Sequence, residues 1–274
     1  MKIIMCPPSE ALRKAISRHP LHSQINPAIA LRQHEVLRAE MLKAGADIVL
    51  LPADPVNPDA PFVQDVIITF PPPGDPTGSS ALLVATRPGA PARRPEVESV
   101  VAAARELVSP TCKAMSIEPP GTMDGGDVLL YGGRVVIGLS GRTNRVGAGQ
   151  LQTALAELGY RVFLCPVTDG RLHFASAITK VRSNRFIGTP RGYADLDAVS
   201  PDVLPKDEIE RIVIPQEELP AHNVVLVGST LFVPAGNPRS VGMLKNAGEQ
   251  VVEVEFDQFT RADAGLTCLM GVVF

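Results

Sequence analysis

A unit of two short strands, a helix and a further strand recurs along this chain of 274 residues. The first copy pairs "VIITF" with "ALLVATRP" and continues with a helix-like run at 94–109 and the short strand "AMSIEP". Paired strands joined by a polar turn are typical of an antiparallel hairpin. Repetition at a period of about 50 residues indicates a propeller-like or array architecture, so this repeat restricts the fold more than any other feature.

Three further copies follow the first. Their hairpins span 127–140, 176–190 and 223–236. The helix and closing strand of each copy span 147–159 and 161–166, then 192–206 and 211–215, then 239–249 and 250–256. In the third copy the helix is poorly defined, because residues 192–206 are rich in Pro and Asp. These four units account for most of the chain.

Two pieces remain at opposite ends of the chain. The N-terminal piece offers the strand "KIIM", a helix around 30–46 and a strand at 47–52, and the C-terminal "LTCLMGVVF" has the composition of a buried strand. If the termini pair, these pieces form a fifth unit. We therefore predict one α/β domain over residues 1–274, a five-fold pseudosymmetric propeller whose last repeat is split between the termini. The antiparallel hairpins argue against the alternative, a doubly wound parallel sheet.

Charge and composition restrict the partners. The net charge is −3, and no run of Lys or Arg suggests binding to nucleic acid or a membrane surface. No segment approaches the roughly 20 apolar residues that span a bilayer, so we expect a cytoplasmic protein with a small-molecule partner. The four cysteines show neither C-x-x-C nor zinc spacing, and we expect free thiols and no metal. Oligomeric state cannot be read from the sequence, which leaves a homodimer open.

Each unit carries a polar or reactive residue just before its first strand. These residues are Gln64 and Asp65, Asp124 and Asp127, His173, His222 and Asn223, and Cys268. Taken singly, Asp before a strand is a turn former, a lone His is structural, and a Cys in an apolar run is an inert small hydrophobe. Units related by rotation would bring all of them to one axis, where they supply a nucleophile, an acid/base and orienting carboxylates.

Such a cavity suits a planar cation. A guanidinium matches several carboxylate oxygens at fixed angles, and its carbon can be attacked by a thiolate. A bound cation would also lower the pKa of the thiol, so that the nucleophile forms where it is needed. The pattern therefore favours cysteine-dependent chemistry on a guanidino compound.

Six motifs in order, "FVQD", "TRPGAPARR", "DGGDVL", "GLSGRTN", "DGRLH" and "GLTC", resemble those of the dimethylarginine dimethylaminohydrolases of the guanidino-modifying (pentein) superfamily. The resemblance implies a five-fold α/β propeller and hydrolysis of an Nω-methylated L-arginine to L-citrulline and a methylamine, through a covalent thiouronium intermediate and without a cofactor. It implies Cys268 as nucleophile, His173 as general acid/base and Asp124 as the carboxylate that orients His173. The implied substrate-binding residues are Asp59, Gln64, Asp65, Arg94 and Arg142.

One position departs from the family. Gln64 stands where the family has an acidic residue, which removes a charge that would contact the substrate cation. An arginine deiminase, or a hydrolase of another guanidino compound, is therefore the alternative. A non-catalytic guanidine-binding protein is a third hypothesis, and the joint presence of Cys268, His173 and Asp124 argues against it.

The remaining residues have structural interpretations. We expect Asp127 and Arg93 to be structural, and Cys112 and Cys165 to take no part in the chemistry. The Pro-rich residues 6–27 lie at the split repeat, which makes them a candidate lid over the cavity, with a plain surface connection as the alternative.

Overall fold

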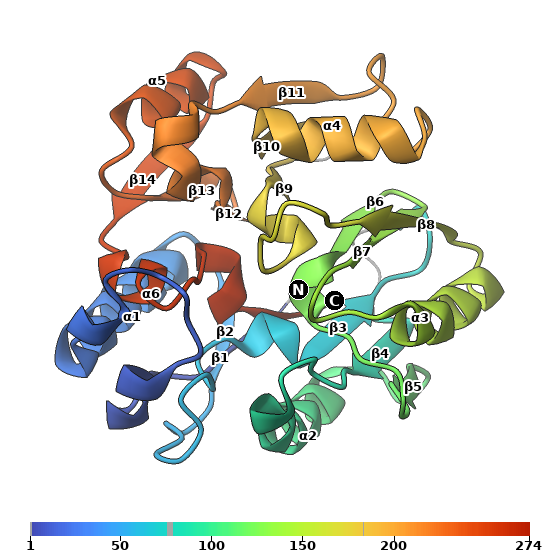
Figure 1. Cartoon of the computed structure of the whole chain (residues 1–274), viewed down its shortest axis with the longest axis horizontal. Helices are drawn as coiled ribbons and strands as arrows, with labels where there is room; N and C mark the ends of the chain where they lie inside the picture. The colour runs from blue at the N-terminus through green and yellow to red at the C-terminus, as the bar shows by residue number, and fades with distance from the viewer. Residues whose placement is uncertain (1, 76–78, 183) are drawn as a thin grey trace.

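The computed structural model describes residues 2–75, 79–182 and 184–274. Five three-stranded sheets stand in a ring, and each sheet carries a helix on its outer side (Figure 1). Each sheet corresponds to one of the predicted units, so the five-fold α/β propeller is confirmed. Ser183, in the turn of the third predicted hairpin, lies outside the described residues. The assignment of the whole chain to one domain stays a prediction.

Every sheet has the same connectivity. The middle strand pairs antiparallel with its hairpin partner and parallel with a strand that follows a helix, because parallel pairing needs a crossover. Four units are continuous in the chain. The first consists of β3 Ile67–Phe70, β4 Leu82–Ala85, α2 Val97–Leu107 and β5 Lys113–Ser116, and the second of β6 Val128–Tyr131, β7 Arg134–Leu139, α3 Arg145–Glu157 and β8 Arg161–Pro166. The third consists of β9 Ile178–Lys180, β10 Arg185–Gly188, α4 Pro190–Val199 and β11 Glu210–Val213, and the fourth of β12 Val225–Val227, β13 Thr230–Pro234, α5 Pro238–Asn246 and β14 Gln250–Val254.

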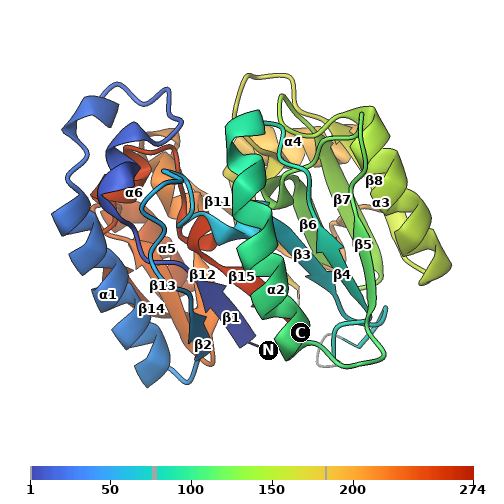
Figure 2. The same ribbon diagram turned by 90° about the horizontal axis from the view of Figure 1, so that it is seen from below.

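The fifth unit joins the two ends of the chain. Its middle strand, β1 Lys2–Met5, pairs antiparallel with β15 Gly271–Val273 and parallel with β2 Asp47–Leu50, which follows α1 Pro27–Lys43. Both views place the termini side by side (Figure 1 and Figure 2). The predicted pairing of the termini is therefore confirmed, and a short helix, α6 Asp257–Thr260, leads back from the fourth unit.

Each unit buries the inner face of its helix in an apolar core that neighbouring sheets share. In the second continuous unit, Leu151 and Leu155 of α3 are fully buried against Val135 and Ile137 of β7. Complete burial of one leucine side chain contributes about 2 kcal/mol. Such packing explains why the helices follow the apolar periodicity of the sequence.

The helix α4 was poorly defined in the sequence but is regular in the structure. The hydroxyl of Thr189 accepts a hydrogen bond from the Gly192 N–H over 3.0 Å, and Pro190 occupies the first turn. Both features stabilise a helix start. The Pro- and Asp-rich composition therefore marks the beginning of a helix and the loop after it.

A 3-10 turn precedes the first strand of every unit. The turns span Val63–Asp65, Gly125–Asp127, Phe174–Ser176, Gln216–His222 and Leu266–Leu269. The last turn corrects the sequence prediction, because Cys268 lies on the turn and β15 begins only at Gly271. Four of these turns contact one another in a row, Leu266–Leu269, Val63–Asp65, Gly125–Asp127 and Phe174–Ser176, which brings the polar residues around them together.

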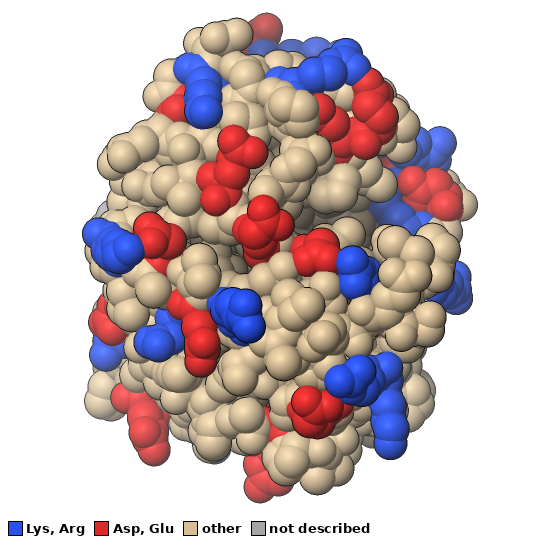
Figure 3. Space-filling model, turned by 90° about the vertical axis from the view of Figure 1, so that its left-hand side faces the viewer, with Lys and Arg blue, Asp and Glu red and all other residues tan. Residues whose placement is uncertain are grey.

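Within the described ranges, each helix is too short or too polar to cross a bilayer. On the face seen in Figure 3, acidic and basic side chains are interspersed and neither sign forms a continuous patch.

Candidate active site

Cys268 has a thiol that two hydrogen bonds around the turn help to position. Its N–H donates to the carbonyl oxygen of Gly265 over 3.1 Å, and the Gly265 N–H donates to the sulfur over 3.4 Å. Burial, followed by the negative charge of Asp65, raises the pKa of the Cys268 thiol to about 12. The protein alone therefore keeps this sulfur protonated at neutral pH.

His173 immediately precedes the turn of the third continuous unit and is 4% exposed. Its Nε2 lies 3.0 Å from Oδ2 of Asp124 and 3.8 Å from Oδ1 of Asp65. Burial alone would lower the pKa of His173, but the carboxylates of Asp65, Asp124 and Asp127 outweigh it and raise this pKa to about 9. His173 is therefore an imidazolium at neutral pH, which is the form that a general acid requires.

Asp124 is fully buried behind His173. Its second oxygen, Oδ1, accepts a hydrogen bond from the Gly89 N–H over 2.9 Å, which fixes the carboxylate in place. The glycines of the "DGGD" turn leave room for the imidazole, because a Cβ at Gly126 would lie 2.7 Å from Nδ1 of His173. Orientation of His173 thus depends on a carboxylate on one side and a glycine on the other.

Asp127 has a different environment. Its Oδ2 accepts from the hydroxyl of Ser140 over 2.6 Å, and its Oδ1 accepts from the N–H of Phe174 over 2.8 Å. Burial raises the pKa of this carboxyl. These contacts hold the residue that follows His173, which fits the structural interpretation of Asp127.

Asp65 and Arg93 form a buried ion pair, with Nη1 of Arg93 lying 2.5 Å from Oδ2 of Asp65. Glu96 binds the same guanidinium through its Oε2, 2.9 Å from Nη2. Burial alone would raise the pKa of Asp65, but the charges of His173 and Arg93 outweigh it and lower this pKa. Asp65 thus carries its negative charge beside both His173 and Cys268.

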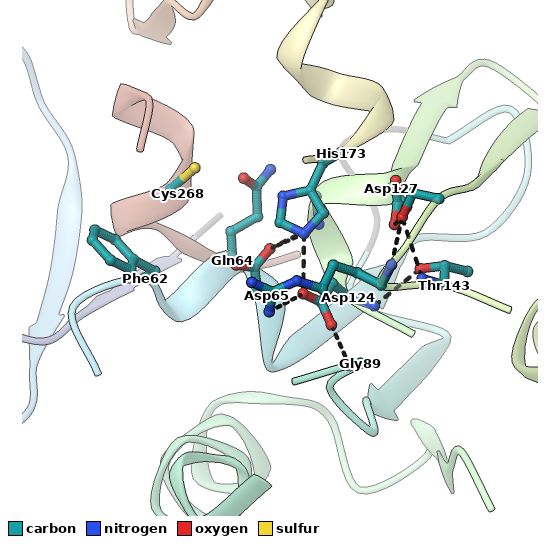
Figure 4. Close-up of polar contacts among 12 residues, drawn as sticks. Phe62, Gln64, Asp65, Gly89, Asp124, Asp127, Thr143, His173 and Cys268 are labelled. Carbon is teal, nitrogen blue, oxygen red and sulfur yellow. Dashed lines mark hydrogen bonds and ion pairs between the residues drawn. The ribbon is translucent and has the colours of Figure 1, made fainter. Parts of the chain in front are cut away.

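These groups meet in one cavity of about 700 Å³ at the ring axis. The predicted residues that line it are Asp59, Gln64, Asp65, Arg142, His173 and Cys268. Figure 4 shows the sulfur of Cys268 directed toward the side of the cavity where His173 lies. Asp59 is 4% exposed and accepts a hydrogen bond from the Ile16 N–H over 3.1 Å.

Arg94 is the predicted substrate-binding residue that the structure does not bring to the cavity. Its Nε donates to the carbonyl oxygen of Pro88 over 3.3 Å, and its neighbour Arg93 lines the cavity instead. The 3-10 turn Pro91–Glu96 is the cause, since it directs Arg93 into the interior and Arg94 away from it. Arg93 thus combines the expected structural ion pairs with a position at the cavity wall.

Comparison with sequence relatives shows the family, although no family model matches the chain. This chain is 33% identical over 270 residues to the N(G),N(G)-dimethylarginine dimethylaminohydrolase of Streptomyces coelicolor, and the match covers 98% of this chain and 95% of that protein. The chain belongs to the dimethylarginine dimethylaminohydrolase family. The enzyme of the same name from Pseudomonas aeruginosa is 29% identical over 245 residues, 88% of this chain and 87% of that enzyme.

Solved structures agree with this family. The Pseudomonas aeruginosa dimethylarginine dimethylaminohydrolase, as a mutant complexed with citrulline, superposes with a TM-score of 0.87 and 28% identity over 100% of this chain and 98% of that one. The N-terminal domain of a cyanobacterial arginine dihydrolase gives a TM-score of 0.82 at 16% identity, covering 98% and 97% of the two chains. At 16% identity, the similarity to the arginine dihydrolase domain shows only that the two chains share a fold.

One cluster in this dimethylarginine dimethylaminohydrolase family member has the spacing of a metal-ligand set. Among the described residues, one oxygen each of Asp65 and Asp124 and a ring nitrogen of His173 lie within 4.8 Å of one another. His173 and Asp124 are hydrogen-bonded to each other. Asp65 pairs with Arg93 through Oδ2 and accepts a hydrogen bond from the Gly126 N–H through Oδ1. We therefore interpret the cluster as an ion-paired network.

The sequence did not single out Asp263, which helps to form the cavity wall. Residues 16–19, part of the candidate lid 6–27, line the cavity, and Asp263 holds them by accepting hydrogen bonds from the Ser17 hydroxyl over 2.9 Å and the Arg18 N–H over 2.6 Å. Asp263 has a φ of 57°, which is uncommon for a residue other than glycine. No sequence pattern signals such a contact between segments far apart in the chain.

Of the three remaining candidates, His222 lies at the cavity, whereas Cys165 and Cys112 do not line it. His222 lines the cavity, but its Nε2 is buried without a hydrogen-bond partner among the described residues. Cys165 is buried, and burial raises its pKa to about 11. Cys112 is partly exposed and is absent from the cavity lining.

Proposed function

We propose that this protein is a cysteine-dependent hydrolase of an Nω-methylated L-arginine, releasing L-citrulline and a methylamine. Membership of a hydrolase family supports the reaction class. The observation that carries the proposal is the shared cavity, in which a buried thiol and an imidazolium held by Asp124 lie among carboxylates.

The first half of the reaction uses Cys268 and His173. A guanidinium that docks beside Asp65 offsets the negative charge that helps keep the thiol protonated, and the thiol loses its proton to solvent. The thiolate attacks the guanidinium carbon, and His173 donates its Nδ1 proton to the departing amine while its Nε2 stays hydrogen-bonded to Asp124. A covalent thiouronium-type intermediate and a neutral imidazole remain.

The second half regenerates the thiolate. Neutral His173 takes a proton from water, and the resulting hydroxide adds to the thiouronium carbon. Collapse of this adduct breaks the C–S bond, releases the ureido group of citrulline and returns the thiolate. Asp124 stabilises the imidazolium that forms again, and neither step requires a metal or an organic cofactor.

The substrate-binding roles follow from charge and position. Asp65 and Asp59 are the candidates for the guanidinium and amino groups, since both carboxylates face the cavity. Arg142 is the candidate for the α-carboxylate, because its side chain is 14% exposed at the cavity wall and lies 3.8 Å from Asp124. The guanidinium of Arg93 is taken up by Asp65 and Glu96, which favours a positioning role for it.

The test is an incubation of wild type and Cys268→Ala with Nω,Nω-dimethyl-L-arginine, Nω-monomethyl-L-arginine and L-arginine in parallel. Citrulline and dimethylamine from wild type alone are the expected products. Ammonia and citrulline from arginine alone would instead establish the deiminase alternative. That alternative arises because Gln64, in the cavity wall, replaces the acidic residue of the family. Turnover by Cys268→Ala at the wild-type rate would refute the role of the thiol.

A further inference from the structure

Glu96 is a buried carboxylate that binds a buried arginine. It ends the 3-10 turn Pro91–Glu96 and is 4% exposed. Its Oε2 accepts two hydrogen bonds from the Arg93 guanidinium, one from Nε over 3.1 Å and one from Nη2 over 2.9 Å. Nε and Nη2 form one edge of the planar guanidinium, so Glu96 fixes the direction in which the third nitrogen, Nη1, points.

The rest of the Arg93 guanidinium binds the segment that carries Asp65. Nη2 also lies within hydrogen-bond distance of two backbone carbonyl oxygens, that of Asp59 at 3.2 Å and that of Phe62 at 3.0 Å. Nη1 donates to Oδ2 of Asp65 over 2.5 Å. Glu96 is therefore joined to Asp65 through a single guanidinium, and all of these residues are buried.

Asp65 acts on both the acid and the nucleophile. Its Oδ1 accepts a hydrogen bond from the Gly126 N–H over 3.1 Å and lies 3.8 Å from Nε2 of His173 (Figure 4). After burial, the largest influence on the pKa of both His173 and Cys268 is the negative charge of Asp65, which raises it. The positive charge of Arg93 lowers the pKa of Cys268. The balance between Asp65 and Arg93 therefore determines how readily the thiol ionises.

Three carboxylates surround the one guanidinium of Arg93, namely those of Asp59, Asp65 and Glu96. Burial raises the pKa of Glu96 to about 7 although Arg93 lowers it, and the charges of Asp59 and Asp65 add to the increase. Glu96 also acts on the buried thiol of Cys6, which stays protonated because burial raises its pKa to about 11. At pH 8, Glu96 therefore carries a negative charge that offsets the positive charge of Arg93.

We propose that Glu96 is a positioning residue that acts through Arg93. By binding the Arg93 guanidinium and offsetting its charge, Glu96 lets the negative charge of Asp65 act on His173 and Cys268. This charge keeps His173 an imidazolium and Cys268 a protonated thiol until a cationic substrate docks. The inference rests on the proposed function, since it concerns the acid and the nucleophile of that reaction.

The decisive variant is Glu96→Gln, which keeps an oxygen for Arg93 and removes the charge. The positive charge of Arg93 is then less offset, so the pKa values of Cys268 and His173 should both fall. The readout is the rate at which neutral 2-chloroacetamide alkylates Cys268 at pH 8, followed by mass spectrometry. A decrease of about one pKa unit gives about tenfold more thiolate, and the lower nucleophilicity of a less basic thiolate reduces the gain to about threefold. We therefore expect Glu96→Gln to react about threefold faster than wild type.

The matched control is Glu98→Gln. Glu98 lies in the first turn of α2 and is exposed, so solvent screens its charge and this variant should keep the wild-type rate. Buried Cys165 should stay unmodified in both variants, which shows that a faster reaction of Cys268 does not come from unfolding. An unchanged or lower rate in Glu96→Gln would overturn the inference, because a structural role alone predicts no faster alkylation of the folded variant. An equal increase in Glu98→Gln would overturn it as well.

Wild type alone provides a second measurement, which serves if Glu96→Gln does not fold. Glu96 gains its negative charge as the pH rises through about 7, and this charge makes the Cys268 thiol harder to ionise. The logarithm of the alkylation rate constant should therefore rise by less than one per pH unit between pH 6 and 8. A rise of one per pH unit over this whole range would show that Glu96 does not act on the thiol.

Both measurements follow alkylation rather than turnover. They therefore decide the inference even if no guanidine is hydrolysed, in which case the proposed function alone fails. If dimethylarginine is hydrolysed, the alkaline limb of the pH profile of kcat should move to lower pH in Glu96→Gln, because the pKa of His173 falls from about 9. An alkaline limb that stays in place would contradict the action of Glu96 on His173.

Discussion

The buried thiol of Cys268 should react far better with a cationic reagent than with a neutral one of the same shape. With a pKa of about 12, the thiol is ionised to about one part in 10⁴ at pH 8, since 8 − 12 = −4. A positive charge about 4 Å from the sulfur contributes about 4 kcal/mol at an effective dielectric constant of about 20. This energy corresponds to about three pKa units, and therefore to about a thousandfold more thiolate.

The assay compares 2-chloroacetamidine with 2-chloroacetamide. Second-order rate constants for alkylation of Cys268 are measured at pH 8 by mass spectrometry, and each is divided by the rate constant of the same reagent with a small free thiol. The normalised preference for the amidine should reach about 10² to 10³ at Cys268. Cys112 is the internal control, because it is partly exposed and outside the cavity lining, and we expect no such preference there.

Two results would refute this reasoning. Equal normalised preferences at Cys268 and Cys112 would show that the cavity does not couple a bound cation to the thiol. A plateau near pH 8 in the rate of neutral chloroacetamide would mean that Cys268 is already ionised, whereas a pKa of about 12 requires the rate to keep rising through pH 9.

Three further perturbations test other parts of the site. Asp124→Asn should lower the pKa of His173 from about 9, because it removes one of the charges that raise this pKa. The alkaline limb of the pH profile of kcat should therefore move to lower pH, and kcat should fall about 10² to 10⁴-fold. An alkaline limb that does not move would argue against the pairing of Asp124 with His173. Gly126→Ala places a Cβ 2.7 Å from Nδ1 of His173 and should abolish citrulline formation, while Gly149→Ala, which meets nothing within 4 Å, should keep wild-type activity. Asp263→Ala removes the acceptor for Ser17 and Arg18 and should speed proteolysis within residues 6–27, with protection by a bound inhibitor; equal cleavage with and without inhibitor would contradict a lid.

The fold could be predicted from the sequence because each unit repeats a local pattern. The polar turn before "LFVPAG", the apolar spacing of the helices and the two unmatched end pieces each follow from residues close together in the chain. The residues before each first strand were predictable for the same reason, since one rotation relates them all. Cys268 and His173 therefore reach one cavity as expected.

The errors arise where a side chain's direction depends on a turn rather than on a periodic element. "LTCL" reads as part of a strand, yet it folds as a 3-10 turn whose Thr267 N–H is bound by Asn223. Adjacent arginines have equal sequence signals, and only the turn Pro91–Glu96 separates the inward Arg93 from Arg94. The hydrogen bonds from Asn223 to Thr267 and from Thr267 to Gln64 join three different units, so no local pattern could reveal them.

Asp65 links the proton affinities of the acid and the nucleophile. Its charge raises the pKa of both His173 and Cys268, so the protein alone holds an imidazolium beside a neutral thiol. A bound guanidinium opposes the field of Asp65 at both residues and lowers both pKa values. His173 stays protonated despite this decrease, because its pKa of about 9 lies well above neutrality and Asp124 stays hydrogen-bonded to it. The thiol gains reactivity from the same change, which makes the arrival of substrate, rather than the resting site, the step that generates the nucleophile.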